Sequence, residues 1–91
     1  MDSDPSSLAT VILALCERAG PGRTIAPAEA ARAYAENRGE GELDWRAHLP
    51  AVRHTAVELA EAGRIVIYRK GKPVDPRDFR GVYRLGAARM D

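Results

Sequence analysis

The sequence predicts an α+β domain in which three helices precede a small antiparallel sheet. Apolar residues recur at helical spacing in three segments before Gly63, and beyond that glycine the apolar period changes from 3.6 to 2. Glycine and proline separate these segments. A chain of 91 residues, 45% of them hydrophobic, has the length and composition of one globular domain, residues 1–91. The order helix, short strand, helix, helix, strand, long loop, strand is that of a winged helix-turn-helix.

Cap residues and glycine turns bound the first two helices. Asp4-Pro5 places a side-chain acceptor at the N-cap and proline at the first helical position, so we expect the first helix to begin there. The glycines on either side of Pro21 end it. Pro27 begins the second helix, which ends at the glycines after Arg38. The predicted inner faces consist of Leu8, Val11, Ile12, Leu15 and Ala19 in the first helix and Ala30, Ala31, Tyr34 and Ala35 in the second.

The third helix carries a proline near its start. Asp44 is its expected N-cap, and Gly63 supplies a left-handed C-cap. Because Pro50 lacks a backbone donor and clashes with the preceding turn, we expect either a kink near Ala47 or a separate short turn before the main helix. The core stripe of this segment consists of Trp45, Leu49, Val52, Ala56 and Leu59.

Two strands are predicted after the third helix. Residues 64–69 and 82–85 alternate around β-branched and aromatic side chains. The intervening residues 70–81 form a wing too long for a tight hairpin, and Asp75 is expected to fold it back in an Asx turn. The ordered core is expected to span about residues 5–85, followed by a flexible tail over residues 86–91.

The charge of the chain is divided between its two halves. Residues 1–44 carry four basic and eight acidic side chains, a net charge of −4, whereas residues 45–91 carry ten basic and five acidic ones, a net charge of +5. A one-sided positive field attracts a polyanion. The third helix of a winged helix can enter the major groove of double-stranded DNA, and a basic wing can contact phosphates. The candidate nucleic-acid-binding residues are Arg46, Arg53 and His54 on the helix and Arg69, Lys70, Lys72, Arg77 and Arg80 on the wing.

Two other interpretations fit the same residues. Exposed arginines on a helix are often only solvated, and cations on a hairpin protect its edge from aggregation. The small net charge of +1 also suits a protein-interaction module without nucleic-acid binding, for which Val57, Val74 and Phe79 are the candidate apolar contacts.

Seven stretches of the chain carry a family resemblance: residues 25–33, Trp45-Arg46, residues 49–53, residues 59–65, Lys70-Gly71, Val74-Asp75-Pro76 and residues 80–85. They resemble a bacterial family described as domain of unknown function 3253. The resemblance covers roughly residues 8–85 and implies a winged-helix fold without implying an activity. The family commonly has serine or cysteine near the start of the second helix, where this chain has Ala26 and Ala28, which predicts a weaker cap.

The remaining composition favours a small binding protein over an enzyme. The single cysteine, Cys16, suits a reducing compartment, so a cytoplasmic location is expected. His48 and His54 lie on different helix faces, which argues against a metal site, and no cofactor motif is present. The spacing of its polar residues matches no catalytic constellation, and its longest apolar run is too short for a membrane span. We expect a monomer, because no helix follows Leu85.

Overall fold

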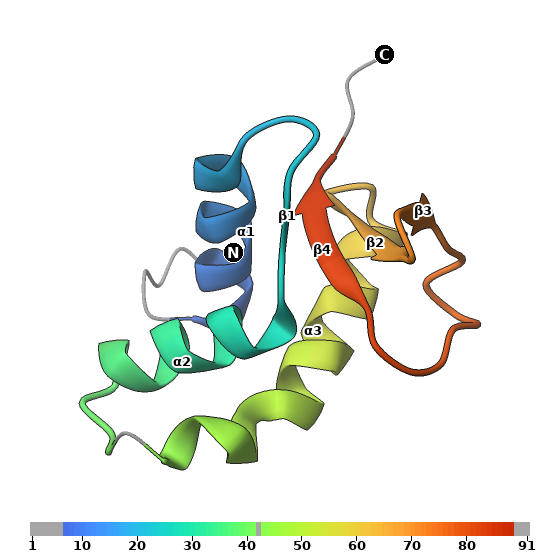
Figure 1. The fold of residues 1–91 in the computed structure, drawn as a ribbon. Helices are drawn as coiled ribbons and strands as arrows, with labels where there is room; N and C mark the ends of the chain where they lie inside the picture. Colours follow the sequence, from blue (N-terminus) through green and yellow to red (C-terminus); the bar gives the residue numbers. More distant parts are fainter. Residues whose placement is uncertain (1–6, 42, 89–91) are drawn as a thin grey trace.

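The computed structural model describes residues 7–41 and 43–88, and these residues form the predicted α+β fold. Three α-helices and one 3₁₀ helix pack beside a four-stranded antiparallel sheet (Figure 1). The order of the helices and the main strands is the predicted one, and the more specific winged-helix assignment stays a prediction. The elements are α1 (Leu8–Ala19), β1 (Thr24–Ile25), α2 (Pro27–Asn37), η1 (Asp44–His48), α3 (Leu49–Glu61), β2 (Ile65–Arg69), β3 (Lys72–Pro73) and β4 (Arg84–Ala87).

Helix α1 is capped by a serine rather than by the predicted aspartate. The Ser7 hydroxyl accepts a hydrogen bond from the Thr10 amide at 3.2 Å, so the N-cap lies directly before Leu8. Both Ser and Asp are good caps, and sequence alone did not choose between two acceptors three residues apart. Asp4-Pro5, the predicted start, lies outside the described residues.

Helix α2 replaces the missing cap hydroxyl with a carboxylate from its own first turn. Glu29 Oε2 accepts a hydrogen bond from the Ala26 amide at 2.9 Å, and Pro27 occupies the first helical position. The helix ends in a Schellman arrangement at Gly39, whose φ of 71° suits glycine. Alanine at the N-cap therefore leaves α2 with one of the two bonds of a capping box.

Pro50 separates a 3₁₀ turn from the main third helix. Helix α3 begins at Leu49, which places the proline in the first helical turn, where a missing amide breaks no helical hydrogen bond. Of the two arrangements expected around Pro50, the separate short turn is the one observed, as η1. Gly63, with φ 77°, follows the end of α3 as predicted, and the amide of Arg64 donates to the Leu59 carbonyl at 2.8 Å.

The sheet has the strand order β1-β4-β2-β3, so the last strand lies between the first two. Leu85 is opposite both Ile25 and Ile67, and Gly86 is opposite both Thr24 and Val66. The second long strand begins at Arg84 rather than at the predicted residue 82, and it includes Gly86 and Ala87, which were predicted as tail. Gly86 is paired on both sides and Ala87 is paired with Ile65 of β2, which an isolated alternating pattern does not reveal.

A tight hairpin lies inside the segment that was predicted to be one long wing. Strands β2 and β3 are joined by Lys70 and Gly71 alone, with φ of 52° and 81°. Two successive positive φ values are typical of the two-residue hairpin turns that match strand twist. The prediction of a loop too long for such a hairpin is wrong here, because lysine at the first turn position is an unusual residue there. The remaining loop comprises residues 74–83.

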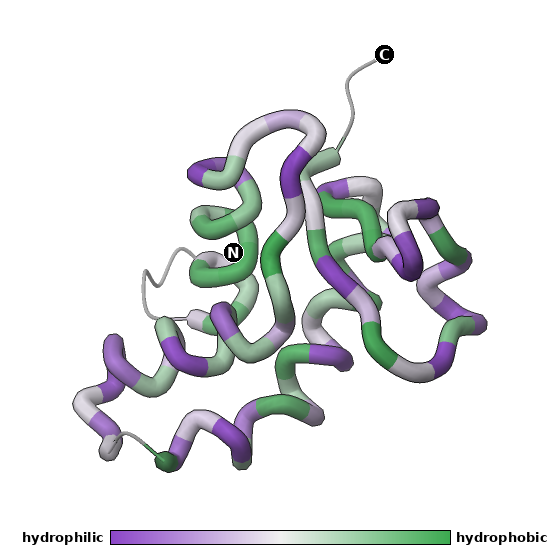
Figure 2. Tube along the Cα trace, in the orientation of Figure 1, coloured by the Kyte–Doolittle hydropathy of each residue, from purple (hydrophilic) through white to green (hydrophobic). Residues whose placement is uncertain are grey.

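The core lies between the helices and the inner face of the sheet. Ile12, Cys16, Val52, Ile67 and Leu85 are the largest fully buried side chains. In Figure 2 the tube of α1 is mostly hydrophobic, whereas α2 alternates between hydrophobic and hydrophilic residues. The predicted stripes are confirmed in their central members, since Ala30, Ala31, Ala56 and Leu59 are also buried in this cluster.

Candidate nucleic-acid interface

Arg53 connects helix α3 to the loop of residues 74–83. Its Nη2 donates a hydrogen bond to the Phe79 carbonyl at 2.8 Å, and its guanidinium lies 4.1 Å from the centre of the Phe79 ring and 5.7 Å from that of Tyr83. The two rings meet edge to face at 5.1 Å. A charged hydrogen bond combined with cation–π contact makes Arg53 a structural link between the loop and α3.

Two of the predicted wing cations also bind their own chain. Arg69 Nε donates to the Val82 carbonyl at 3.0 Å, because this side chain follows Ile65 and Ile67 on the inner side of β2. Arg77 forms a hydrogen-bonded ion pair with Glu61 at the end of α3. The hydrogen bond and the charge of Glu61 raise the pKa of Arg77 above its ordinary value. Asp75 Oδ1 accepts from the Arg77 amide at 2.9 Å, which confirms the predicted Asx turn.

The loop of residues 74–83 lies against one stripe of α3. Arg53, Val57 and Glu61 are four residues apart and share this stripe, and the first and last of them contact the loop directly. Val57 is half-buried. The loop thus covers part of the helix surface that the sequence offered for the major groove, which leaves His54 and Glu58 as neighbours on the exposed part.

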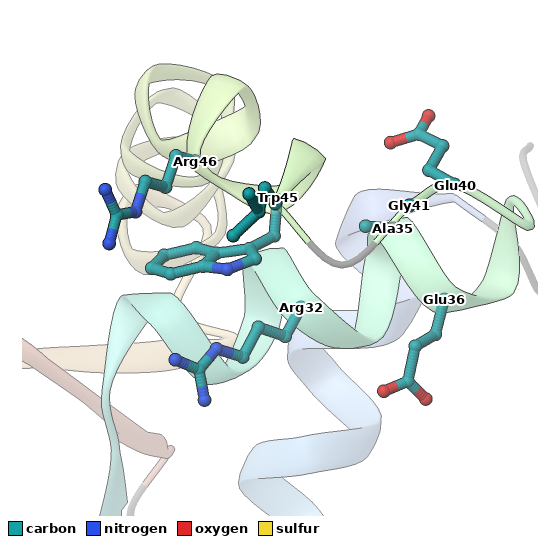
Figure 3. Close-up of a pocket in the computed structure, with 8 residues that line it drawn as sticks. Arg32, Ala35, Glu36, Glu40, Gly41, Trp45 and Arg46 are labelled. Carbon is teal, nitrogen blue, oxygen red and sulfur yellow. The ribbon is translucent and has the colours of Figure 1, made fainter.

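The other two helical candidates lie in different surroundings. His54 is exposed and its Nε2 lies 3.5 Å from the Glu58 carboxylate, one helical turn away. Arg46 is exposed on η1, and its guanidinium lies 5.4 Å from the centre of the Trp45 ring. Arg32 of α2 approaches the same ring to 4.7 Å, and Figure 3 shows the indole between the two guanidiniums. These two arginines flank a hollow of about 510 Å³ between α2 and η1.

The three other predicted cations are exposed at the hairpin and in the loop. Lys70 lies in the β2–β3 turn, Lys72 lies opposite Arg69 on β3, and Arg80 precedes the turn at Gly81. Among the described residues, none of these three side chains takes part in a hydrogen bond or ion pair of the kind that holds Arg53, Arg69 and Arg77. Their charges therefore face solvent.

The outer face of the sheet carries a hollow that the sequence did not predict. Thr24, Val66, Tyr68, Arg84 and Gly86 form this outer face, because they alternate with the buried strand residues. A Cβ on Gly86 would lie 2.9 Å from the Tyr68 ring, so the ring covers this glycine. The hollow measures about 270 Å³ and is lined by Gly22, Thr24, Tyr68, Lys70, Gly71 and Arg84.

The outer sheet face and its turns are uniformly positive. Arg84 donates to the Thr24 hydroxyl at 2.6 Å and to the Thr24 carbonyl at 3.1 Å, which holds its guanidinium over the hollow. Arg23 precedes Thr24 in the chain, and Lys70 borders the same hollow. The four strands, the hairpin turn and residues 20–23 contain no aspartate or glutamate. Arg84 and Tyr68 lie opposite each other in the pairing of β2 with β4. The sequence does not show this register, so it did not predict that the two residues are neighbours.

One carboxylate, Glu40, joins the far end of α2 to η1. Glu40 contacts Arg38 Nε at 2.8 Å and His48 Nε2 at 2.6 Å, and these hydrogen bonds, that to His48 first, hold the pKa of Glu40 below its ordinary value. The His48 ring meets Tyr34 edge to face at 4.8 Å. This cluster attaches η1 to α2. Its members come from α2, the turn after it and η1, so no local pattern in the sequence reveals it.

An open apolar groove lies where α2, α3 and the loop meet. It measures about 690 Å³ and is lined by Ala26, Pro27, Ala28, Leu49, Pro50, Arg53, Gly81, Val82 and Tyr83. Val82 is 83% exposed, which is unusual for a large aliphatic side chain. The predicted apolar contacts lie elsewhere: Phe79 is buried in the core, and Val57 and Val74 are half-buried against it.

Other reactive groups are enclosed or isolated. Burial raises the pKa of the Cys16 thiol to about 11, so this cysteine is a core residue, as predicted. Burial also raises the pKa of Tyr83, while the nearby Arg53 opposes this shift. In the described ranges, no three metal-ligating side chains come together, and no helix has the length and apolar character that a bilayer crossing requires.

Comparison with known proteins gives a family. The family model described as Protein of unknown function (DUF3253) matches residues 5–88. A search of the curated proteins finds no match to the chain. Because the family match extends over nearly the whole sequence, the protein belongs to the DUF3253 family of proteins of unknown function.

Proposed function

We propose that this protein binds double-stranded DNA, mainly through its phosphates, with the outer sheet face and the β2–β3 turn. The observation that carries the proposal is the positive charge of this surface: Arg23, Lys70 and Arg84 lie on or beside the outer sheet face, and Lys72 follows the hairpin turn on β3. No carboxylate stands in the four strands, the hairpin turn or residues 20–23. Lysine and arginine that face solvent attract phosphates and release condensed counterions on binding.

In this proposal DNA contacts the sheet and the hairpin turn instead of the third helix. The loop of residues 74–83 covers α3 beside Arg53, and Glu58 lies beside His54, where a carboxylate would repel a phosphate backbone. Tyr68 adds a flat aromatic ring beside Lys70 and Arg84, a combination that also suits an exposed base. A single-stranded probe is therefore included in the test.

Titration of labelled duplex DNA at several salt concentrations tests the proposal. If all four cations contact phosphates, the logarithm of the binding constant falls with a slope of about −3.6 against the logarithm of salt concentration. The corresponding loss of affinity between about 50 and 200 mM salt is about a hundredfold. Absence of binding at the lowest salt concentration, to duplex and single strand alike, would overturn the proposal.

Two pairs of substitutions distinguish the sheet surface from the helix surface. Lys70→Gln with Lys72→Gln is expected to reduce the salt slope by about 2, since each lost phosphate contact removes about 0.9. Arg46→Gln with His54→Gln alters the same number of side chains on the helical side and is expected to leave the slope nearly unchanged. The reverse pattern would restore the helix as the contact surface.

The second candidate function is a protein-interaction module. The open apolar groove with exposed Val82 favours it. The groove and the outer sheet face have no lining residue in common, so one chain can carry both functions.

A further inference from the structure

We infer that the apolar groove binds a peptide segment of a partner protein in which one large apolar side chain stands beside carboxylates. This inference rests on the second candidate function above and names the chemistry of its partner. The nine residues that line the groove include one charged side chain, Arg53, and no acid.

The groove is built from segments that are held in place before a partner arrives. Pro27 and Pro50 each stand in the first turn of a helix, and their rings restrict the backbone on two sides of the groove. On the third side, Arg69 donates to the Val82 carbonyl, and Tyr83 is largely buried against Phe79. A preformed apolar depression suits a side chain such as leucine, because little order must be created on binding.

Arg53 gives the groove its charge preference. Its guanidinium is already positioned by the Phe79 carbonyl and by two aromatic rings, yet the hydrogen bond to Phe79 uses only one of its N–H groups. A partner carboxylate that meets this guanidinium does not have to immobilise a mobile side chain. The residues that contribute most to binding at protein interfaces are often arginines, and they often lie at well-packed pockets.

The surroundings of the groove strengthen this preference. Arg80 precedes Gly81 in the chain and is exposed, and Arg69 lies behind the same turn, within 3.0 Å of where a Cβ on Gly81 would stand. Glu29 is the nearest acidic residue in sequence, and its carboxylate is engaged by the Ala26 amide. Arg53, Arg69 and Arg80 outnumber Glu29 around the groove, and this excess of positive charge attracts an acidic segment and repels a basic one.

Titration of the isotope-labelled full chain with two synthetic peptides tests the inference by amide chemical shifts. One peptide carries a single leucine flanked by glutamates, and the other has lysine at every glutamate position. We expect the acidic peptide to shift the amides of Ala28, Leu49 and Gly81, and the basic peptide to bind at least about tenfold more weakly. Equal affinities, shifts outside the groove, or no shift at millimolar peptide would each overturn it.

Two matched variants locate the contact. Val82→Glu and Leu43→Glu each place a carboxylate on a large, exposed hydrophobic position, 83% and 79% exposed, so neither change disturbs the core. Val82→Glu is expected to abolish binding of the acidic peptide, while Leu43→Glu, at the hollow between α2 and η1, leaves it unchanged. Equal effects of the two substitutions would contradict the inference.

The outcome of the peptide test is independent of the outcome of the DNA test. Peptide binding is read at the groove, whereas DNA binding is read at Lys70 and Lys72 and through its salt slope. A chain that binds DNA but neither peptide loses only the groove proposal, and one that binds the acidic peptide without DNA loses only the sheet-face proposal.

Discussion

The loop of residues 74–83 and the β2–β3 hairpin both carry basic side chains, but these side chains have different surroundings. Three arginines on or next to the loop are bound to the chain itself: Arg53 to Phe79, Arg69 to Val82 and Arg77 to Glu61. Lys70 in the turn and Lys72 at the start of β3 are exposed. The planar guanidinium donates along several directions to carbonyls and rings, whereas the ammonium group is more strongly hydrated.

This contrast separates structural cations from cations that are free to bind a partner. In the sequence they form one basic segment, and all were candidates for phosphate contact. In the fold, Arg53 and Arg77 link residues 74–83 to α3 and Arg69 links them to β2, while Lys70 and Arg84 border the hollow on the outer sheet face.

The largest expected effect comes from removing the link between the loop and α3. Arg53→Ala removes a hydrogen bond to a charged donor and two ring contacts, so we expect the free energy of unfolding to fall by about 2 kcal/mol. Lys72→Ala, the control on exposed strand β3, is expected to change it by less than about 0.5 kcal/mol. Urea denaturation measures both, and equal effects would break the distinction between the two regions.

A smaller effect of opposite sign is expected in the hairpin turn. Lys70 has a φ of 52°, a left-handed conformation that asparagine tolerates better than lysine. Lys70→Asn should therefore raise the free energy of unfolding by about 0.5–1 kcal/mol while removing one unit of charge. Lys72→Asn removes the same charge from a strand position and serves as the control. If both variants had the same stability, the turn would not be strained.

The smallest effect concerns the partly exposed cluster that attaches η1 to α2. Because the folded-state pKa of Glu40 lies below its ordinary value of 4.5, its contribution to stability is present above pH 4.5 and is lost as the pH falls through the folded-state pKa. Thermal unfolding followed by Trp45 fluorescence should show this loss in the wild type. Glu40→Gln should show a flatter dependence below pH 4.5, and an unchanged dependence would assign the acid sensitivity to another carboxylate.

Local rules predicted the three helices and their C-terminal ends, whereas the N-cap of α1 is Ser7 and that of η1 is Leu43 instead of the predicted Asp44. The buried stripes around Ile12, Ala31 and Val52, the 3₁₀ turn before Pro50 and the left-handed Gly63 all follow from spacing and from the conformational limits of proline and glycine. The Asx turn at Asp75 is equally local, since its donor is two residues away. These features require no knowledge of distant partners.

The sheet and the binding surfaces were less predictable. The pattern of residues 82–85 did not reveal that pairing begins at Arg84 and continues through Gly86, which the Tyr68 ring covers. Likewise, nothing local distinguishes Arg53, which links the loop to α3, from Arg46, which lies beside Trp45. Each of these facts depends on a contact between residues far apart in the chain.

By itself, the sequence determined the fold class, the helix boundaries near proline and glycine, and the excess of positive charge in the second half, because these depend on neighbours within a few residues. Only the tertiary structure decided which cations are free. The loop folds back onto α3, where the Phe79 carbonyl binds Arg53 and Glu61 binds Arg77, whereas Lys70 in the tight turn and Lys72 after it face solvent. The basic wing of the sequence is thus two regions, one that supports the fold and one that faces solvent.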